Sequence, residues 1–132
     1  MTTTKQKISG KKAFLYSVFH LNLAYSSIAE KDFPDIVKKC YWPLLHIAEK
    51  FPKAISLEAS GYTLEIIKKI DPSWVLKLRE LIKNGTCEFI GSGYTQIIGT
   101  LVPAEVNEKN LAFGNEIYHN ILGMTPTIAY DN

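Results

Sequence analysis

The chain has 132 residues, of which 46% are hydrophobic and 21% are charged, an ordinary balance for one globular domain with a hydrophobic core. The formal net charge of +2 comes largely from lysines near the start and is too small and too local to favour nucleic acid as a partner. No apolar stretch reaches the ~18 residues needed to cross a membrane. We therefore expect a loose basic N-terminus over residues 1–11 and one domain over residues 12–132.

The start of the chain also resembles a secretion signal, because basic residues precede an apolar run at residues 13–24. His20 and Asn22 interrupt that run, and no small-x-small cleavage site follows it. Cys40 and Cys87 fall in a predicted helix and a predicted strand, so we expect free buried thiols rather than a disulfide. We predict a cytoplasmic protein.

The first half of the chain predicts two strands separated by a broken helix. Residues 13–20 are apolar on both faces, which is typical of a central parallel strand. A helix over residues 34–51 begins with Pro34 at its first position, and Pro43 predicts a kink or a break into two helices. Residues 53–59 form the second predicted strand.

The second half predicts three helices and two strands. A short helix over residues 62–70 is followed by a second one that begins at Asp71-Pro72 and ends at Asn84-Gly85. Residues 86–90 form the third strand, and residues 127–131 begin a fourth. Between them lies a helix over residues 103–122 that ends at Gly123. Its predicted apolar stripe consists of Val106, Phe113, Ile117 and Ile121.

The order β-α-β-α-α-β-α-β, with no internal repeat, indicates an α/β fold with parallel strands, either an open sheet or part of a (β/α) barrel. Four strands do not close a barrel, and a barrel of eight units takes about 250 residues. We therefore expect either a small open sheet or the first part of a larger barrel.

Polar residues collect where the predicted strands end. Because ligands of α/β proteins bind at the carboxyl ends of the strands, these residues are the candidate binding site. The glycines of Gly91-Ser92-Gly93 allow a sharp turn or a close approach at this end. Glu88 lies inside the third strand, where a buried carboxylate would need a partner. The candidate substrate-binding residues are His20, Asn22, Glu58, Glu88, Ser92, Tyr94 and Asp131.

Each candidate also has a purely structural interpretation. His20 fits a hydrogen-bonded residue at a strand end, and Glu58 fits a solvated strand end or the partner of a cap. Ser92 fits a turn, and Tyr94 fits either loop packing or stacking on a sugar. The dinucleotide fingerprint, the phosphate-binding lysine motif and the nucleophile-elbow spacing are absent from the sequence. We expect no cofactor and no metal, because His20-Leu21-Asn22 is only half of a metal-binding pattern.

Three stretches resemble the N-terminal region of glycoside hydrolase family 57. Phe19-His20-Leu21-Asn22 is similar to a strand-one motif of the His-x-His-Gln-Pro type, although Asn22 stands where the family usually has histidine and no Gln-Pro follows. Residues 85–94 and 97–103 resemble the second motif, in which a glutamate precedes a small-residue turn and an aromatic residue. Residues 123–132 resemble the approach to the third motif.

This resemblance implies the first half of a seven-stranded barrel that acts on α-glucan or a related polysaccharide. His20 and Glu88 would line or support the sugar subsite. Retaining glycosidases use two carboxyl groups about 5 to 5.5 Å apart, and the family's nucleophile would lie beyond Asn132. We nominate no catalytic residue in this chain, and we expect residues 1–132 alone to be inactive.

Two other functions remain open at this point. One is a non-catalytic half-barrel that binds a carbohydrate or a partner, either the missing barrel half or a second copy of the chain. The other is a metal-dependent polysaccharide deacetylase, whose strand-one aspartates are not visible in this sequence.

Overall fold

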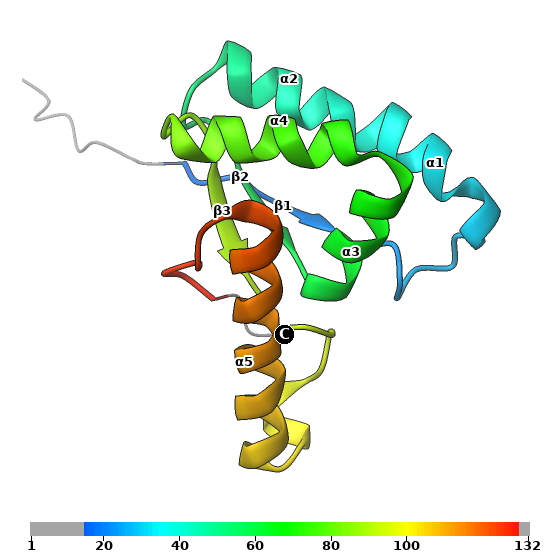
Figure 1. Cartoon of the computed structure of the whole chain (residues 1–132), viewed down its shortest axis with the longest axis vertical. Helices are drawn as coiled ribbons and strands as arrows, with labels where there is room; N and C mark the ends of the chain where they lie inside the picture. Colours follow the sequence, from blue (N-terminus) through cyan, green and yellow to red (C-terminus); the bar gives the residue numbers. More distant parts are fainter. Residues whose placement is uncertain (1–14, 130–132) are drawn as a thin grey trace, which may run out of the picture.

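The computed structural model describes residues 15–129 and contains three parallel strands. They are β1 (Val18–Leu21), β2 (Ser56–Ala59) and β3 (Glu88–Gly91), and β2 lies between the other two. Helices connect consecutive strands, as Figure 1 shows. The structure therefore confirms the predicted α/β class with parallel strands, although each strand is shorter than predicted.

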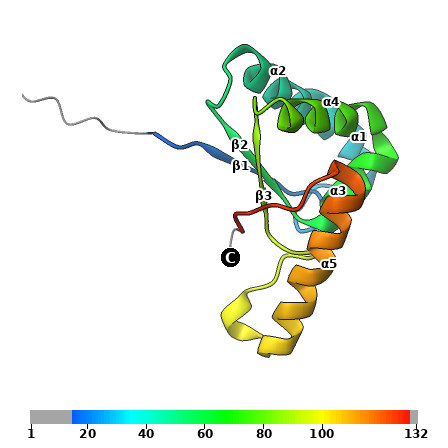
Figure 2. The same ribbon diagram turned by 60° about the vertical axis from the view of Figure 1, so that its left-hand side comes forward.

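The register of the strands sorts their side chains onto two faces. His20 is opposite Glu58, and Glu58 is opposite Ile90. Because side chains alternate along a strand, Leu57 points to the face opposite Glu58 and joins the hydrophobic core. In Figure 2 the helices lie on one side of the strands, so the sheet has a helix-facing side and an open side.

The first helical segment is interrupted, as Pro43 predicts. A short turn η1 (Glu30–Asp32) and α1 (Phe33–Ile36) lead into a π-helical stretch, η2 (Val37–Tyr41), and then into α2 (Trp42–Lys50). Proline has no N–H to donate to the carbonyl four residues earlier, and its ring crowds that carbonyl. The α-helical hydrogen bonding is therefore broken just before Pro43.

The next two helices begin at side-chain caps. The Ser60 hydroxyl accepts from the Thr63 N–H at the start of α3 (Gly61–Ile70). Asp71 accepts from two N–H groups in the first turn of α4 (Pro72–Lys83), which confirms the predicted start. The other oxygen of Asp71 accepts from the Trp42 indole at 2.7 Å, so the cap also ties α4 to α2.

The last helix, α5 (Ala104–Leu122), follows the short turn η3 (Gly99–Leu101) and ends at Gly123 as predicted. Gly123 has a left-handed backbone conformation. The predicted stripe was wrong in its first half, because Phe113 is 59% exposed and Val106 is also exposed. The buried stripe instead runs through Gly114, Tyr118, Ile121 and Leu122. A side chain at Gly114 would overlap the backbone of Gly93, so this close approach sets the buried side of the helix.

Only the beginning of the predicted fourth strand lies within the described residues. Ala129 forms a parallel bridge with Gly91, and the Gly91 N–H donates to the Ile128 carbonyl at 3.0 Å. The rest of that prediction, including Asp131, lies outside residues 15–129. The backbone that is described therefore approaches β3 on the side away from β2.

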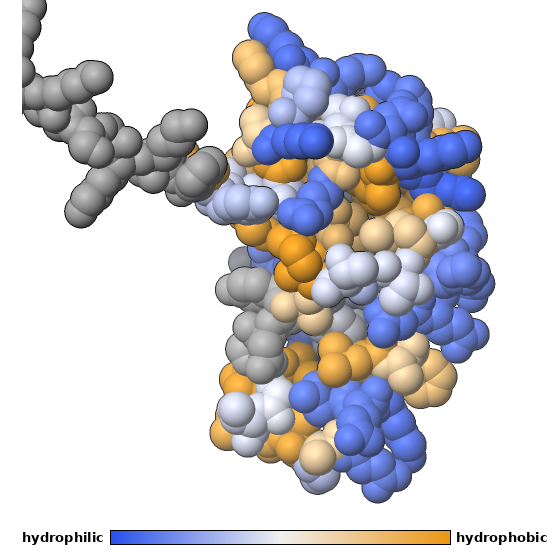
Figure 3. Space-filling model, turned by 90° about the vertical axis from the view of Figure 1, so that its left-hand side faces the viewer, coloured by the Kyte–Doolittle hydropathy of each residue, from blue (hydrophilic) through white to orange (hydrophobic). Residues whose placement is uncertain are grey.

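The surface is mixed in character. On the face shown in Figure 3, hydrophobic residues gather in the middle and hydrophilic ones along the right-hand margin. Cys87 is buried, but Cys40 is exposed, so the prediction of two buried thiols was wrong for Cys40. Within residues 15–129, no helix is both long and apolar enough to cross a membrane.

Candidate functional site

The centre of the candidate site is a pair formed across the register of β1 and β2. His20 and Glu58 are opposite each other on the open side, and the Nδ1 atom of His20 bonds to Glu58 Oε2. The His20 side chain is 38% exposed, whereas that of Glu58 is 1% exposed. His20 is part of β1, as the predicted strand over residues 13–20 implies, and Asn22 follows that strand. The interpretation of Glu58 as a solvated strand end was wrong, because its side chain is 1% exposed.

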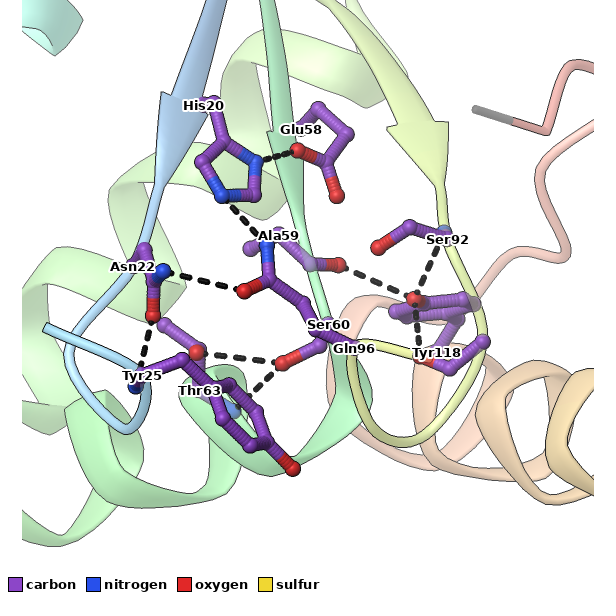
Figure 4. A network of polar contacts seen from close by, with 11 residues as sticks. His20, Asn22, Tyr25, Glu58, Ala59, Ser60, Thr63, Ser92, Gln96 and Tyr118 are labelled. Atoms are coloured by element: carbon purple, nitrogen blue, oxygen red, sulfur yellow. Dashed lines mark hydrogen bonds and ion pairs between the residues drawn. The ribbon is translucent and has the colours of Figure 1, made fainter. Parts of the chain in front are cut away.

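The pair extends into a row of polar side chains, drawn in Figure 4. The Nε2 atom of His20 bonds to the amide nitrogen of Gln96. The amide oxygen of Gln96 accepts from the Asn22 amide at 3.0 Å, and the Asn22 oxygen accepts from the Tyr25 N–H at 2.9 Å. The loop after β1 and the loop after β3 therefore meet above the strand pair, as expected for the carboxyl ends of parallel strands.

Gln96 is part of this group, although the sequence does not predict it as a site residue. It lies in the predicted loop after the third strand, at the end of the sheet where ligands were expected. Its distance of 76 residues from His20 gives no local pattern, and a neutral amide has no charge to draw attention to it. Its position in a loop at the carboxyl end was the only available signal.

Two buried oxygens at this edge have no hydrogen-bond partner among the described residues. They are Oε1 of Glu58 and Oγ of Ser92, and the two residues are 1% and 6% exposed. Figure 4 shows both side chains at the carboxyl ends of β2 and β3. Burying a polar oxygen without a partner is costly, and more so when it is charged, so this edge of the sheet is a candidate position for a polar ligand.

Tyr118 of α5 fixes the backbone on which Ser92 stands. Its hydroxyl accepts from the Ser92 N–H and lies within donating distance of the carbonyls of Ala59 (2.9 Å) and Gly93 (2.7 Å). Burial raises the pKa of Tyr118, so the phenol stays protonated and remains a donor. The carboxyl ends of β2 and β3 are thereby held together from the helix-facing side.

The remaining predicted residues are not in this group. Tyr94 follows β3 as predicted, but its hydroxyl donates to Glu65 of α3 at 3.0 Å. Glu88 is the first residue of β3 and is exposed, so the prediction of a buried carboxylate was wrong. It accepts from the Ser56 hydroxyl at 3.1 Å, at the amino ends of the strands. Asp131 is outside the described residues.

Glu88 and Ser56 help to line a hollow of about 430 Å³ at the amino ends of β2 and β3. Ligands of α/β folds bind at the carboxyl ends, so we place the candidate site at His20 and Glu58 rather than in this hollow. Among residues 15–129, no three His, Cys, Asp or Glu side chains converge as metal ligands would.

Comparison with known proteins shows which family this chain resembles. The model of glycosyl hydrolase family 57 matches residues 13–131. An alpha-amylase of Pyrococcus furiosus is 30% identical over 74 residues, and a 4-alpha-glucanotransferase of Thermococcus litoralis is 31% identical over 74 residues. Each match covers 55% of this chain and 11% of the relative.

A solved structure is also similar. The crystal structure of the 4-alpha-glucanotransferase from Thermococcus litoralis matches with a TM-score of 0.68 and 25% sequence identity. The match covers 85% of this chain and 18% of the solved chain. The chain therefore spans a small part of the proteins that it resembles.

Proposed function

The chain belongs to glycosyl hydrolase family 57, and we propose that it supplies the first strand–helix units of a glycosidase acting on α-glucan. The names of its relatives support the substrate class, since one is an alpha-amylase and the other a 4-alpha-glucanotransferase. Within this proposal, the group of His20, Asn22, Glu58, Ser92 and Gln96 binds sugar hydroxyls.

The observation that carries the proposal is the half-paired carboxylate of Glu58. One of its oxygens bonds to His20, and the other is buried without a partner among residues 15–129. A sugar hydroxyl is a neutral donor and acceptor, so it would donate to Glu58 Oε1 and accept from the Ser92 hydroxyl. Hydrogen bonds to charged groups are worth about 1.5–3 kcal/mol.

We assign the two carboxyl groups of a retaining mechanism to neither Glu58 nor Glu88. Glu58 is held by His20 on the open side of β2, whereas Glu88 bonds to Ser56 at the opposite end of the strands. We therefore propose a binding role for the Glu58 group, with the nucleophile outside residues 1–132. A non-catalytic sugar-binding half-barrel would use the same group in the same way.

Calorimetric titration of the chain with maltotriose tests the binding site. We expect saturable binding, and Glu58→Gln should raise the Kd about tenfold or more, since ~1.4 kcal/mol is a factor of ten. Glu88→Gln is the matched control on the same open side and should leave the Kd within about twofold. If the two substitutions changed the Kd equally, Glu58 would not be part of the binding site.

An assay of reducing-sugar release separates binding from catalysis. We expect residues 1–132 to bind the sugar without releasing product. Release of glucose units by the purified chain would show that a catalytic pair lies within it and would overturn our assignment of the nucleophile.

A further inference from the structure

The hydrogen bonds of the polar row at the carboxyl edge can run in only one direction, because the group at one end of the row can donate but not accept. The backbone N–H of Tyr25 can only donate, so the atom of Asn22 that faces it must be the amide oxygen. The amide nitrogen of Asn22 then faces Gln96 and can only donate. The facing atom of Gln96 is therefore its oxygen.

The same logic fixes the ring of His20. With its oxygen turned to Asn22, Gln96 presents its amide nitrogen, a donor, to Nε2 of His20. Nε2 must accept, so the ring proton lies on Nδ1, which faces the carboxylate of Glu58. A ring protonated on Nε2 would place two donors against each other. Turning over both amides would move that conflict to the Tyr25 N–H.

We propose that Asn22 and Gln96 are positioning residues that hold His20 neutral, with its proton on Nδ1 and its lone pair on Nε2. Which nitrogen of a histidine carries the proton is set by the hydrogen bond made at the other nitrogen. Here the hydrogen bond at Nε2 is made by the Gln96 amide, whose orientation is fixed by Asn22 and, through Asn22, by the Tyr25 N–H. The carboxylate of Glu58 accepts a hydrogen bond from Nδ1 in both a neutral and a charged ring, and it favours the charged one. It therefore fixes the proton on Nδ1, whereas the absence of a second proton from Nε2 is set by the amides.

One consequence rests on the proposed function. A sugar hydroxyl that takes the place of the Gln96 amide at Nε2 would have to donate to the ring. His20 would then act as a hydrogen-bond acceptor at this edge and not as a proton donor. The assignment of the ring proton itself does not depend on any sugar and can be tested without one.

Nitrogen-15 NMR of the full chain, with labelled histidine, measures the protonation of each ring nitrogen. The chain has three histidines, and the exposed residues His46 and His119 serve as internal references. At neutral pH we expect a protonated Nδ1 and an unprotonated Nε2 for His20, with the signals assigned by their loss in His20→Gln. A protonated Nε2, in either a neutral or a charged ring, overturns the proposal.

Two substitutions test whether the amides make the choice. Gln96→Glu replaces the donor facing Nε2 with an acceptor, so His20 should gain a proton there and lose its unprotonated signal. Asn22→Asp removes the donor facing Gln96, which should turn the Gln96 amide over and give the same result. Asn115→Asp, at an exposed position of α5, adds the same charge and should change nothing.

An unchanged His20 spectrum in both Gln96→Glu and Asn22→Asp overturns the proposal. If either variant fails to fold by circular dichroism, the spectrum of the unsubstituted chain still decides the assignment. A sugar-binding failure with the expected ring protonation would count against the proposed function alone.

Discussion

Leu57 and Glu58 are neighbours in β2, and they are equally buried, at 0% and 1% exposed, on opposite sides of the sheet. Leu57 lies on the helix-facing side and belongs to the hydrophobic core. Glu58 lies on the open side, where one carboxylate oxygen bonds to His20 and the other has no partner among the described residues. The same degree of burial therefore has different energetic consequences for the apolar side chain and for the carboxylate.

Under the proposed function, burial contributes to stability on one side of the sheet and to ligand binding on the other. On the helix-facing side, burial removes apolar surface from water and stabilises the fold. On the open side, burial of a charge costs free energy unless the charge is fully paired. A residue that is buried at a cost is a better candidate for ligand binding than one whose burial stabilises the protein.

The largest effect should come from the helix-facing side. Leu57→Ala removes a fully buried side chain and leaves a cavity under the helices, so the free energy of unfolding should fall by about 2–5 kcal/mol. Urea denaturation measures the change. Leu76→Ala, at a position that is 63% exposed, is the matched control and should change it by less than about 0.5 kcal/mol. Similar losses in both variants would mean that Leu57 is not a core residue.

The hydroxyl of Tyr118 links the helix-facing side to the candidate site, because it forms hydrogen bonds at the carboxyl ends of both β2 and β3. Tyr118→Phe keeps the ring but leaves the buried Ser92 N–H without its acceptor, so we expect a loss of about 1–3 kcal/mol. Tyr62→Phe, at a tyrosine that is 40% exposed, should cost less than about 0.5 kcal/mol. If Tyr118→Phe cost no more than Tyr62→Phe, the hydrogen bonds of the Tyr118 hydroxyl would not stabilise the strand ends.

Alkaline pH should lower the free energy of unfolding, because Tyr41 is a buried tyrosine. Burial raises the pKa of this phenol to about 12, whereas an unfolded tyrosine titrates near about 10. Above about pH 10 the unfolded state loses a proton that the folded state keeps, so stability should fall as the pH rises, by at most about 1.4 kcal/mol per pH unit for one group.

Urea denaturation between about pH 8 and pH 11 tests this sign. Tyr41→Phe should show a shallower fall than the unsubstituted chain, and the remaining fall would come from other groups whose pKa is raised, among them Tyr118, Cys87 and Lys77. Tyr25→Phe, at an exposed position, should match the unsubstituted chain. A fall of the same steepness in Tyr41→Phe would contradict the assigned cause.

Local patterns in the sequence were enough to predict much of the fold. Pro43 marked the broken helix, Asp71-Pro72 the start of α4, and Gly123 the end of α5, because each acts through its own backbone geometry. The buried side of α5 was not predictable in this way. It depends on the contact between Gly114 and Gly93, which periodicity does not encode.

The candidate site was predicted only in part for the same reason. His20, Asn22, Glu58 and Ser92 were found because strand ends of a parallel sheet meet at one edge. Glu88 was placed too deep, since the strand begins at Glu88 itself, two residues later than predicted. Gln96 and the direction of Tyr94 depend on how the loop after β3 folds back, and no local pattern fixes that path.

The smallest effects should distinguish the two glutamates of the open side. Glu88 is exposed and accepts from Ser56, and glutamine keeps that acceptor, so Glu88→Gln should change stability by less than about 0.5 kcal/mol. Glu58→Gln also keeps an acceptor for His20 and removes a buried charge, so we expect stability to be unchanged or slightly raised.

Taken with the sugar titration, this pair of substitutions separates a binding residue from a structural one. If Glu58→Gln weakens maltotriose binding while stability holds, the charge of Glu58 is kept for the ligand rather than for the fold. A loss of more than about 2 kcal/mol in Glu58→Gln would mean that the carboxylate is fully paired in the folded chain. The burial of Glu58 would then stabilise the protein as that of Leu57 does.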